Sequence, residues 1–259
     1  MQKVYGIIGF PLSHSFSNRY FSSKFEKDNV PDSTHKVFPL KDISAFMPLI
    51  QQEENLLGLN VTIPYKETVI PYLDELDETA KAVGAVNTIK VIHQDQETKK
   101  TKLIGYNTDV FGFGNALKPF LKNNHQRALI LGTGGAAKAV AYVLKQLGID
   151  YFFVSRQKDN PSLPKNSTVF TYEELNHPHF SSCHLIVNCS PAGMSPNINQ
   201  FPAIPYEFIT PEHLLFDLIY NPDETIFLRK GKEKGALTQN GLTMLYLQAE
   251  ESWRIWNKE

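Results

Sequence analysis

The sequence predicts an α/β protein of two domains, with a dinucleotide-binding domain of the Rossmann type in its second half. Apolar runs of strand length alternate with amphipathic helical patterns along most of the 259 residues. A glycine turn, Gly132-Thr-Gly134-Gly-Ala-Ala137, follows the apolar run Ala128–Leu131 and opens a helical pattern. About half of the chain precedes this turn, so we expect a further domain before it.

The first half alternates strands and helices. Strands are expected at Val4–Gly9, Lys36–Leu40, Leu57–Ile63, Asn87–His93 and Lys102–Tyr106. Helices are expected where apolar residues recur at helical spacing, at Ser17–Lys27, Ile43–Gln52 and Glu78–Val83. The polar stretch His93–Lys100 predicts a hairpin turn. Together these elements predict a sheet covered by helices on both faces.

The second half continues in the same way after Asn107-Thr-Asp109, which marks the expected domain boundary. Strands are expected at Ala128–Leu131, Tyr151–Val154, Leu185–Val187 and Leu214–Phe216. Helices are expected at Val110–Leu121, Gly135–Leu147, Thr225–Lys234 and Gly241–Trp256. Ser155–Thr168 is the most loop-like stretch.

Composition argues against several function classes. Lys+Arg 26 against Asp+Glu 27 gives a net charge of −1, which offers no general attraction to nucleic acid or an anionic membrane. The only two cysteines, Cys183 and Cys189, do not form a disulfide scaffold and fit a reducing, cytoplasmic compartment. We expect no metal, because the chain has no CxxC, no HExxH and no His/Cys cluster. It also has no signal-peptide pattern and no run long enough to span a membrane.

The glycine turn indicates cofactor binding. Gly132 permits a tight strand-to-helix turn, Gly134 lets a pyrophosphate approach the backbone, and the small Ala137 lets helix and strand pack closely. The unpaired N–H groups at the helix start then face the phosphates. The alternative is a bare turn that binds nothing, but the flanking strand and helix patterns favour a cofactor site.

The cofactor is expected to be NADP rather than NAD. An acidic residue at the end of the second strand grips the ribose 2′-hydroxyl of NAD. Here the strand Tyr151–Val154 is followed by Ser155-Arg156-Gln-Lys158, with no acid. Arg156 suits a 2′-phosphate through charge-assisted hydrogen bonds. Lys158 taken alone indicates no more than a solvated basic turn.

Three polar clusters punctuate the first half: Ser13-His14-Ser15, Asn60-Val-Thr62-Ile-Pro-Tyr-Lys66 and Asn107-Thr-Asp109. Ligands of open α/β sheets bind beyond the carboxyl ends of strands, and hydroxyls and amides there suit a polyhydroxylated ligand. Each cluster also has a purely structural interpretation. Ser15 or Ser17 caps a helix, Thr62 is an ordinary strand residue, and His14 is structural or faces solvent.

Lys66 and Asp109 are both expected at the start of a helix. Asp109 precedes a helix, so locally it reads as an N-cap. Lys66 is expected to open a helix, where the dipole disfavours a cation, so its presence there suggests a function.

Taken together and in this order, motifs spanning nearly the whole chain resemble those of the shikimate dehydrogenase family. They are Gly9-Phe-Pro-Leu-Ser13-His-Ser15, Asn60-Val-Thr62-Ile-Pro-Tyr-Lys66, Gly84-Ala-Val-Asn87-Thr, Gly105-Tyr-Asn107-Thr-Asp109, Gly132-Thr-Gly-Gly-Ala136, Asn188-Cys-Ser-Pro-Ala-Gly-Met194, Asp217-Leu-Ile-Tyr220-Asn-Pro and Asn240-Gly241-Leu-Thr-Met-Leu-Tyr-Leu-Gln248.

The resemblance implies an NADP-dependent enzyme of chorismate and aromatic amino acid biosynthesis that reversibly reduces 3-dehydroshikimate to shikimate. It implies a substrate domain, residues 1–106, completed by the C-terminal helix in 238–259. The NADP-binding domain is then 107–237, with the active site in the cleft between the two. The binding partner is a small molecule, and the chain is a monomer or a homodimer.

The resemblance also assigns residues. Lys66 and Asp109 form the catalytic pair. The substrate ligands are Ser13, Ser15, Asn60, Thr62, Asn87, Tyr220 and Gln248. The cofactor ligands are Gly132, Thr133, Gly134, Gly135, Ala136, Ser155, Arg156, Lys158, Leu218 and Gly241.

The chain departs from the family in two places. Phe16-Ser17-Asn18 replaces the lysine and Ser-Pro that many relatives carry after the first serines, and Ser-Arg-Gln replaces the commoner Asn-Arg-Thr.

The chemistry of ketone reduction agrees with Lys66 and Asp109 as the catalytic pair. Hydride transfer leaves negative charge on the ketone oxygen, and a lysine cation stabilises that charge and delivers a proton to the oxygen. Two alternatives remain open: an NAD-using quinate/shikimate dehydrogenase, and a non-catalytic NADP-binding regulator on the same scaffold.

Overall fold

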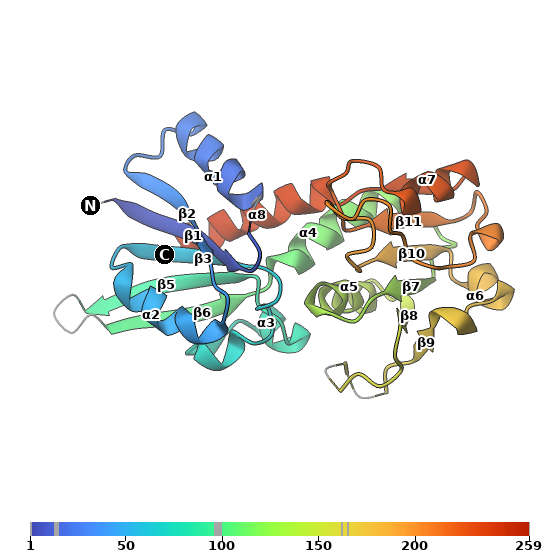
Figure 1. The fold of residues 1–259 in the computed structure, drawn as a ribbon, viewed down its shortest axis with the longest axis horizontal. Coiled ribbons are helices and arrows are strands. Elements are labelled where there is room, and N and C mark those ends of the chain that lie inside the picture. The colour runs from blue at the N-terminus through green and yellow to red at the C-terminus, as the bar shows by residue number, and fades with distance from the viewer. Residues whose placement is uncertain (1, 13–15, 96–99, 162, 165, 259) are drawn as a thin grey trace. The chain divides into compact units, whose positions relative to one another are not determined.

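The computed structural model describes residues 2–12, 16–95, 100–161, 163–164 and 166–258 (Figure 1). Ser13, His14 and Ser15 lie outside the described residues. The chain divides into two compact units, Met1–Thr108 with Ala249–Glu259, and Asp109–Gln248. The first border falls after Thr108, whereas the predicted border lies after Tyr106. The second falls after Gln248, inside the C-terminal helix, whereas the predicted border lies after Leu237.

The first unit is built on a mixed sheet of six strands in the order β2-β1-β3-β5-β6-β4. Its strands are β1 (Lys3–Gly9), β2 (Ser33–Pro39), β3 (Leu56–Val61), β4 (Glu75–Leu76), β5 (Thr88–Asp95) and β6 (Lys100–Tyr106). β1 is parallel to β2 and β3, whereas β5 is antiparallel to both β3 and β6. As a result, β1, β2, β3 and β6 all end at the edge where β5 begins.

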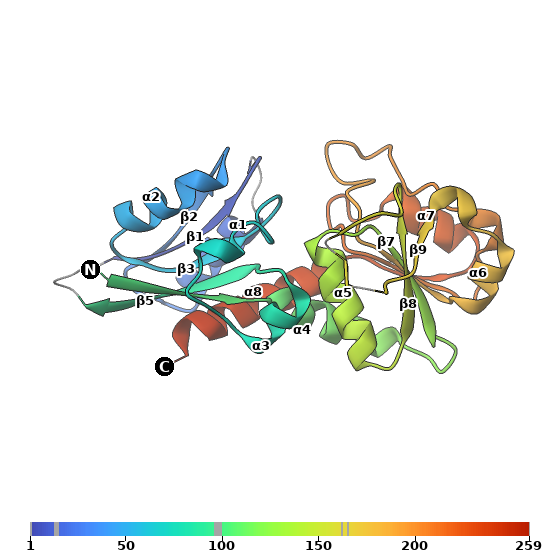
Figure 2. The ribbon, with the colours of Figure 1, turned by 90° about the horizontal axis from the view of Figure 1, so that it is seen from below.

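Helices cover both faces of this sheet, as the sequence predicts (Figure 2). The helices are α1 (Phe16–Lys27), α2 (Phe46–Gln52), α3 (Glu78–Val83) and α8 (Leu242–Asn257). On one face, Phe46 and Ile50 of α2 pack on the sheet core. On the other, Phe21 of α1 and Trp256 of α8 pack around Tyr5 of β1.

The expected helix at Lys66 does not form, which is a correction. Lys66 lies in successive turns that lead to a short 3-10 helix, Ile70–Tyr72. Pro64 and Pro71 bracket the segment, and proline disfavours helical backbone at the residue before it and donates no N–H. The argument from the helix dipole therefore does not apply to Lys66. The expected helix Ile43–Gln52 is likewise divided into a 3-10 turn, Ile43–Ala45, and α2.

The second unit is a fully parallel sheet of six strands in the order β12-β11-β10-β7-β8-β9. The strands are β7 (Arg127–Leu131), β8 (Asp150–Ser155), β9 (Val169–Thr171), β10 (Leu185–Asn188), β11 (Leu214–Asp217) and β12 (Leu237–Gln239). This is the doubly wound dinucleotide-binding order, with its switch point between β7 and β10. The sequence missed β9 and β12, which are too short to show an apolar pattern.

Helices also cover both faces of the second sheet. They are α4 (Thr108–Leu117), α5 (Gly135–Gln146), α6 (His177–Ser182) and α7 (Ile226–Glu233). Phe113 of α4 and Val140 of α5 pack on one face, while Phe180 of α6 and Phe227 of α7 pack on the other. Further 3-10 turns lie at Lys118–Phe120, Tyr172–Glu174 and Tyr206–Phe208. Among the described residues, no helix has the length and apolar character needed to cross a membrane.

Candidate active site

The ends of β1 and β3 lie side by side at one edge of the first sheet. The N–H of Thr62 donates to the carbonyl of Ile8 at 3.0 Å, and the N–H of Phe10 donates to that of Ile63 at 3.0 Å. These bonds tie the segment that follows β1 to the one that follows β3. The half-buried Thr62 therefore lies beside the end of β1, the strand that precedes the predicted serine ligands in the chain.

Lys66 is tied to the same edge through its backbone. Its carbonyl accepts the N–H of Val86 at 2.7 Å, directly before Asn87. The side chain of Asn107, which follows β6, donates to the carbonyl of Ala85 at 2.8 Å. The turn after β3, the start of β5 and the end of β6 are thereby joined, and Lys66 and Asn87 are brought to one place.

Asn87 caps α4 from outside the helix. Its Oδ1 accepts the N–H of Thr108 at 2.7 Å, and its Nδ2 donates to Thr108 Oγ1 at 2.9 Å. The local interpretation of Asp109 as an N-cap is therefore corrected: α4 begins at Thr108, and Asp109 lies in its first turn. A carboxylate is favoured there by the helix dipole. Asp109 is nevertheless only 5% exposed, which is unusual for an aspartate that serves a helix end alone.

Asn60 faces away from this edge. Alternation along β3 turns its side chain toward α8, where Nδ2 donates to Ser252 Oγ at 3.2 Å. Its Oδ1 is buried without a hydrogen-bond partner among the described residues, as are both ring nitrogens of His35. The sequence grouped Asn60 with Thr62 and Lys66, but the structure places its side chain between the sheet and a helix.

Asp109 on α4 and Gln248 on α8 both lie in the second unit, and the two helices touch there. A Cβ at Gly112, one turn after Asp109 on α4, would lie 2.6 Å from the carbonyl oxygen of Met244 and 3.0 Å from Cβ of Gln248. Gln248 is buried, and its amide donates to the carbonyl of Leu245 at 3.0 Å. The face of α4 that carries Asp109 is thus the face that packs on α8 near Gln248.

The glycine turn lies at the switch point of the second sheet. Gly132 has a φ of +115°, which favours glycine, and its N–H donates to the carbonyl of Val154 at 2.8 Å. A Cβ there would press on the backbone of Cys189 after β10. Gly134 stands at the N-cap of α5 without a side-chain cap, and no atom lies within 4 Å of where its Cβ would be. An uncapped helix start beside open space fits a pyrophosphate.

The basic residues after β8 differ in their surroundings. Arg156 is exposed and lies near Tyr172: burial raises the pKa of that tyrosine, and the charge of Arg156 lowers it. Lys158 forms an ion pair with Glu174, whose carboxylate also accepts the N–H of Thr171 at 2.8 Å. Both residues are exposed, but Lys158 is paired with Glu174 at the surface, and Arg156 lies at the end of β8.

Leu218 and Gly241 are held together beyond β11. The N–H of Gly241 donates to the carbonyl of Ile219 at 3.0 Å, and the N–H of Leu218 donates to that of Asn188 at 3.0 Å. These bonds fix the segment that leads to the half-buried Tyr220.

Asp217, at the end of β11, directly precedes the predicted cofactor ligand Leu218, and the sequence predicted no role for it. It is fully buried and accepts hydrogen bonds from Asn188 Nδ2 at 3.0 Å, Ile219 N–H at 3.0 Å and Thr225 Oγ1 at 2.6 Å. Burial raises its pKa to about 7, against these hydrogen bonds, which lower it. A lone carboxylate ending an apolar strand was the available signal.

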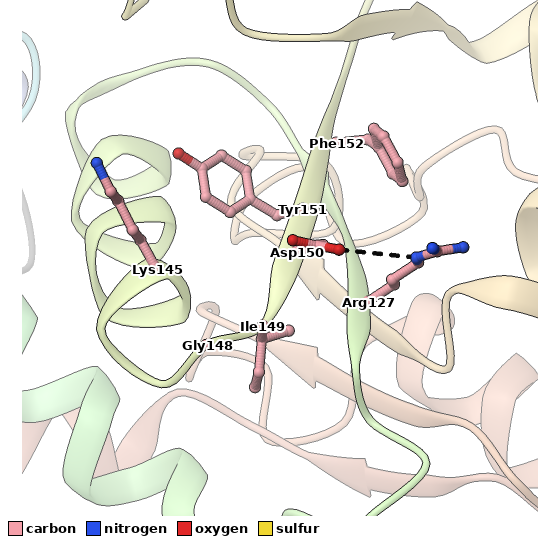
Figure 3. A pocket seen from close by; sticks show the side chains of 7 residues that line it. All are labelled: Arg127, Lys145, Gly148, Ile149, Asp150, Tyr151 and Phe152. Atoms are coloured by element: carbon pink, nitrogen blue, oxygen red, sulfur yellow. Dashed lines mark ion pairs between the residues drawn. The ribbon is translucent and has the colours of Figure 1, made fainter.

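A pocket at the opposite edge of the second sheet carries none of the predicted site residues. It is lined by Arg127, Lys145, Gly148, Ile149, Asp150, Tyr151 and Phe152 (Figure 3). These residues lie at the amino ends of β7 and β8 and at the end of α5, whereas the glycine turn follows the carboxyl end of β7. The ion pair across it, Arg127 to Asp150, is long at 3.8 Å and exposed.

Comparisons find similar proteins over nearly the whole chain. Residues 7–89 match the family model described as the shikimate dehydrogenase substrate binding domain. The NADP(+)-dependent shikimate dehydrogenase of Carboxydothermus hydrogenoformans is 39% identical, over 98% of this chain and 91% of that protein.

Solved structures agree as well. The crystal structure of shikimate dehydrogenase from Aquifex aeolicus is 32% identical and superposes with a TM-score of 0.84, covering 99% of this chain and 92% of that one. The enzyme of Thermus thermophilus, solved in complex with NADP(H) and shikimate, is 28% identical with a TM-score of 0.83, covering 99% and 94%.

Proposed function

The chain belongs to the shikimate dehydrogenase family, and from this premise we propose that it reduces 3-dehydroshikimate to shikimate with NADPH, reversibly. The observation that carries the proposal is the glycine turn at the switch point of a fully parallel sheet, with an uncapped helix start beside it. A sheet of this order takes a dinucleotide at that point. The substrate and the cofactor in the proposal are taken from the relatives, whose names state shikimate and NADP(+).

The second unit holds the cofactor in this proposal. Gly132 to Ala136 and the N–H groups of α5 bind the pyrophosphate, and Leu218 and Gly241 line the cofactor further along. Ser155 and Arg156 bind the 2′-phosphate, for which an exposed guanidinium without an acidic competitor at the strand end is suited. When bound, NADPH supplies the hydride. Lys158 contributes less to binding than Arg156, because Glu174 already pairs with it.

The edge of the first sheet supplies the substrate ligands. Thr62 and Asn87 bind hydroxyl groups, joined by Ser13 and Ser15 on the carboxylate and by Tyr220 and Gln248 from the second unit. The side chain of Asn60 faces α8, which supports a role in holding β3 rather than a direct contact.

Lys66 and Asp109 perform the proton chemistry. As hydride reaches the ketone carbon, the C=O π electrons move to oxygen, and the Lys66 ammonium stabilises the charge and gives up one proton to form the hydroxyl. Asp109 orients the ammonium and the reacting hydroxyl. In the reverse direction neutral Lys66 takes the hydroxyl proton while hydride leaves the carbon.

The decisive experiment follows NADPH absorbance with purified protein and 3-dehydroshikimate, and repeats the assay with NADH. Shikimate and quinate are then tested as substrates for oxidation with NADP and NAD. Turnover with 3-dehydroshikimate that is faster with NADPH supports the proposal. Binding of NADPH without turnover of any of these substrates would identify a regulator instead, and a preference for quinate with NAD would identify the other alternative.

The setting of the enzyme is part of the proposal. Cys183 and Cys189 are both free thiols, which supports a reducing, cytoplasmic compartment. We propose a monomer or a homodimer, which sedimentation equilibrium distinguishes directly.

A further inference from the structure

A buried polar cluster in the first unit links the C-terminal helix to the start of α4. Its centre is the hydroxyl of Ser252 on α8, which is fully buried. Ser252 Oγ lies 2.7 Å from Thr88 Oγ1, 3.2 Å from Thr108 Oγ1 and 3.2 Å from Asn60 Nδ2. A single side chain therefore touches β3, β5 and the first residue of α4.

Packing alone does not account for a serine at this position. Its neighbours on the face of α8 that packs on the sheet are apolar: Ala249, Ile255 and Trp256 form one cluster with Tyr5 and Phe21. Burying a hydroxyl costs free energy unless it is hydrogen-bonded, and an alanine fits the same face at Ala249. The hydroxyl is thus explained by its bonds to the cluster.

The cluster continues to a predicted substrate ligand. Thr108 Oγ1 accepts Nδ2 of Asn87, and the N–H of Thr108 donates to Oδ1 of Asn87. Thr88 Oγ1 also lies 3.3 Å from Asn87 Oδ1. The two residues that Ser252 contacts through hydroxyls therefore both hydrogen-bond with the Asn87 amide and help to orient it. Thr108 is also joined by one peptide bond to Asp109.

We propose that Ser252 is a positioning residue: through Thr88 and Thr108 it fixes the Asn87 amide and the start of α4, and so the placement of Asn87 and Asp109 for the reaction. The kinetic consequence rests on the proposed function. The structural consequence, a firmly held first turn of α4, does not.

The test compares Ser252→Ala with Trp256→Phe. The control removes another buried bond from α8 to β5, Trp256 Nε1 to the Ile89 carbonyl at 3.0 Å, which touches neither Asn87 nor Thr108. Thr88→Val, which deletes the other hydroxyl of the shortest contact, serves as a second test variant. For each variant, we would measure thermal stability, KM for shikimate, KM for NADP, kcat, and hydrogen exchange of the Thr108 amide by NMR.

Ser252→Ala and Thr88→Val are expected to raise KM for shikimate, lower kcat and speed exchange at Thr108. Each effect is expected to be about three- to tenfold, the equivalent of one net hydrogen bond, with KM for NADP unchanged. Trp256→Phe is expected to lower the melting temperature without these changes. The proposal is overturned if both test variants behave like Trp256→Phe. If the wild type does not oxidise shikimate, the proposed function fails, and exchange at Thr108 still decides for or against the positioning role.

Discussion

Gly241, the residue before α8, lies so close to the backbone carbonyl of Leu218 that even a methyl group at position 241 would overlap its oxygen. Both residues are predicted to line the cofactor, and the close approach explains why this position needs glycine. The approach fixes the start of α8 against the segment that follows β11.

Gly241→Ala is therefore expected to push Leu218 aside and weaken NADP binding by at least about tenfold, or about 1.4 kcal/mol. Fluorescence titration with NADPH measures this. Gly114→Ala is the matched control, because its new Cβ would make an ordinary contact, 3.4 Å from Val143. Equal affinities in the two variants would show that the Leu218 segment does not contact the cofactor.

Arg156 is expected to recognise the 2′-phosphate of NADP. Losing one charge-assisted contact costs about 1.5–3 kcal/mol, so Arg156→Ala should raise KM for NADP by about ten- to a hundredfold and leave KM for NAD nearly unchanged. Lys158→Ala is the control: because Lys158 is paired with Glu174, its loss should have a smaller effect. Equal losses with both cofactors in Arg156→Ala would place Arg156 outside the phosphate site.

Lys66 and Asp109 are expected to act as one unit. General acid–base assistance contributes about 10²–10⁴ in rate, so Lys66→Ala should lower kcat by that order while shikimate still binds. The double variant with Asp109→Ala should be little slower than the worse single variant, because residues of one unit are not additive. Single-turnover kinetics measure the rate loss in each variant, and calorimetry measures whether shikimate still binds. Fully multiplicative losses would mean that the two residues work independently.

His35 is expected to make the protein acid-sensitive. Burial between the sheet and Phe21, on which its ring stacks, lowers its pKa to about 4, and the nearby Asn60 amide offsets this only in part. The unfolded chain therefore takes up the proton first, at the ordinary pKa of about 6.5. Stability is complete above about pH 6.5 and falls as the pH drops from there toward about 4, by about 2 kcal/mol at about pH 5.

Urea unfolding at several pH values measures this loss in the wild type and in His35→Phe, which keeps an aromatic ring against Phe21. The variant should lose about 2 kcal/mol less than the wild type between about pH 7 and about pH 5. Burial also lowers the pKa of His125 and His213, so part of the acid sensitivity should persist. Identical pH profiles for the two proteins would show that His35 does not titrate as described.

Features that depend on neighbouring residues could be predicted from the sequence. The helices with clear apolar periodicity, the β5–β6 hairpin and the turn at Gly132 were all predicted, because short-range sterics and side-chain spacing set them. The order of the polar motifs also indicated the family. The prediction that Lys66 opens a helix is wrong, because the prolines on either side of it, Pro64 and Pro71, disfavour helical backbone.

Only the tertiary structure decided what depends on residues far apart in the chain. β9 and β12 form because they pair with neighbouring strands, Asn87 caps α4, and the side chain of Asn60 faces Ser252. Lys158 also pairs with Glu174, and Asp217 is buried among its donors. These features follow from hydrogen bonds and burial between distant segments, whose free energy exceeds the weak local preferences that a sequence pattern reports.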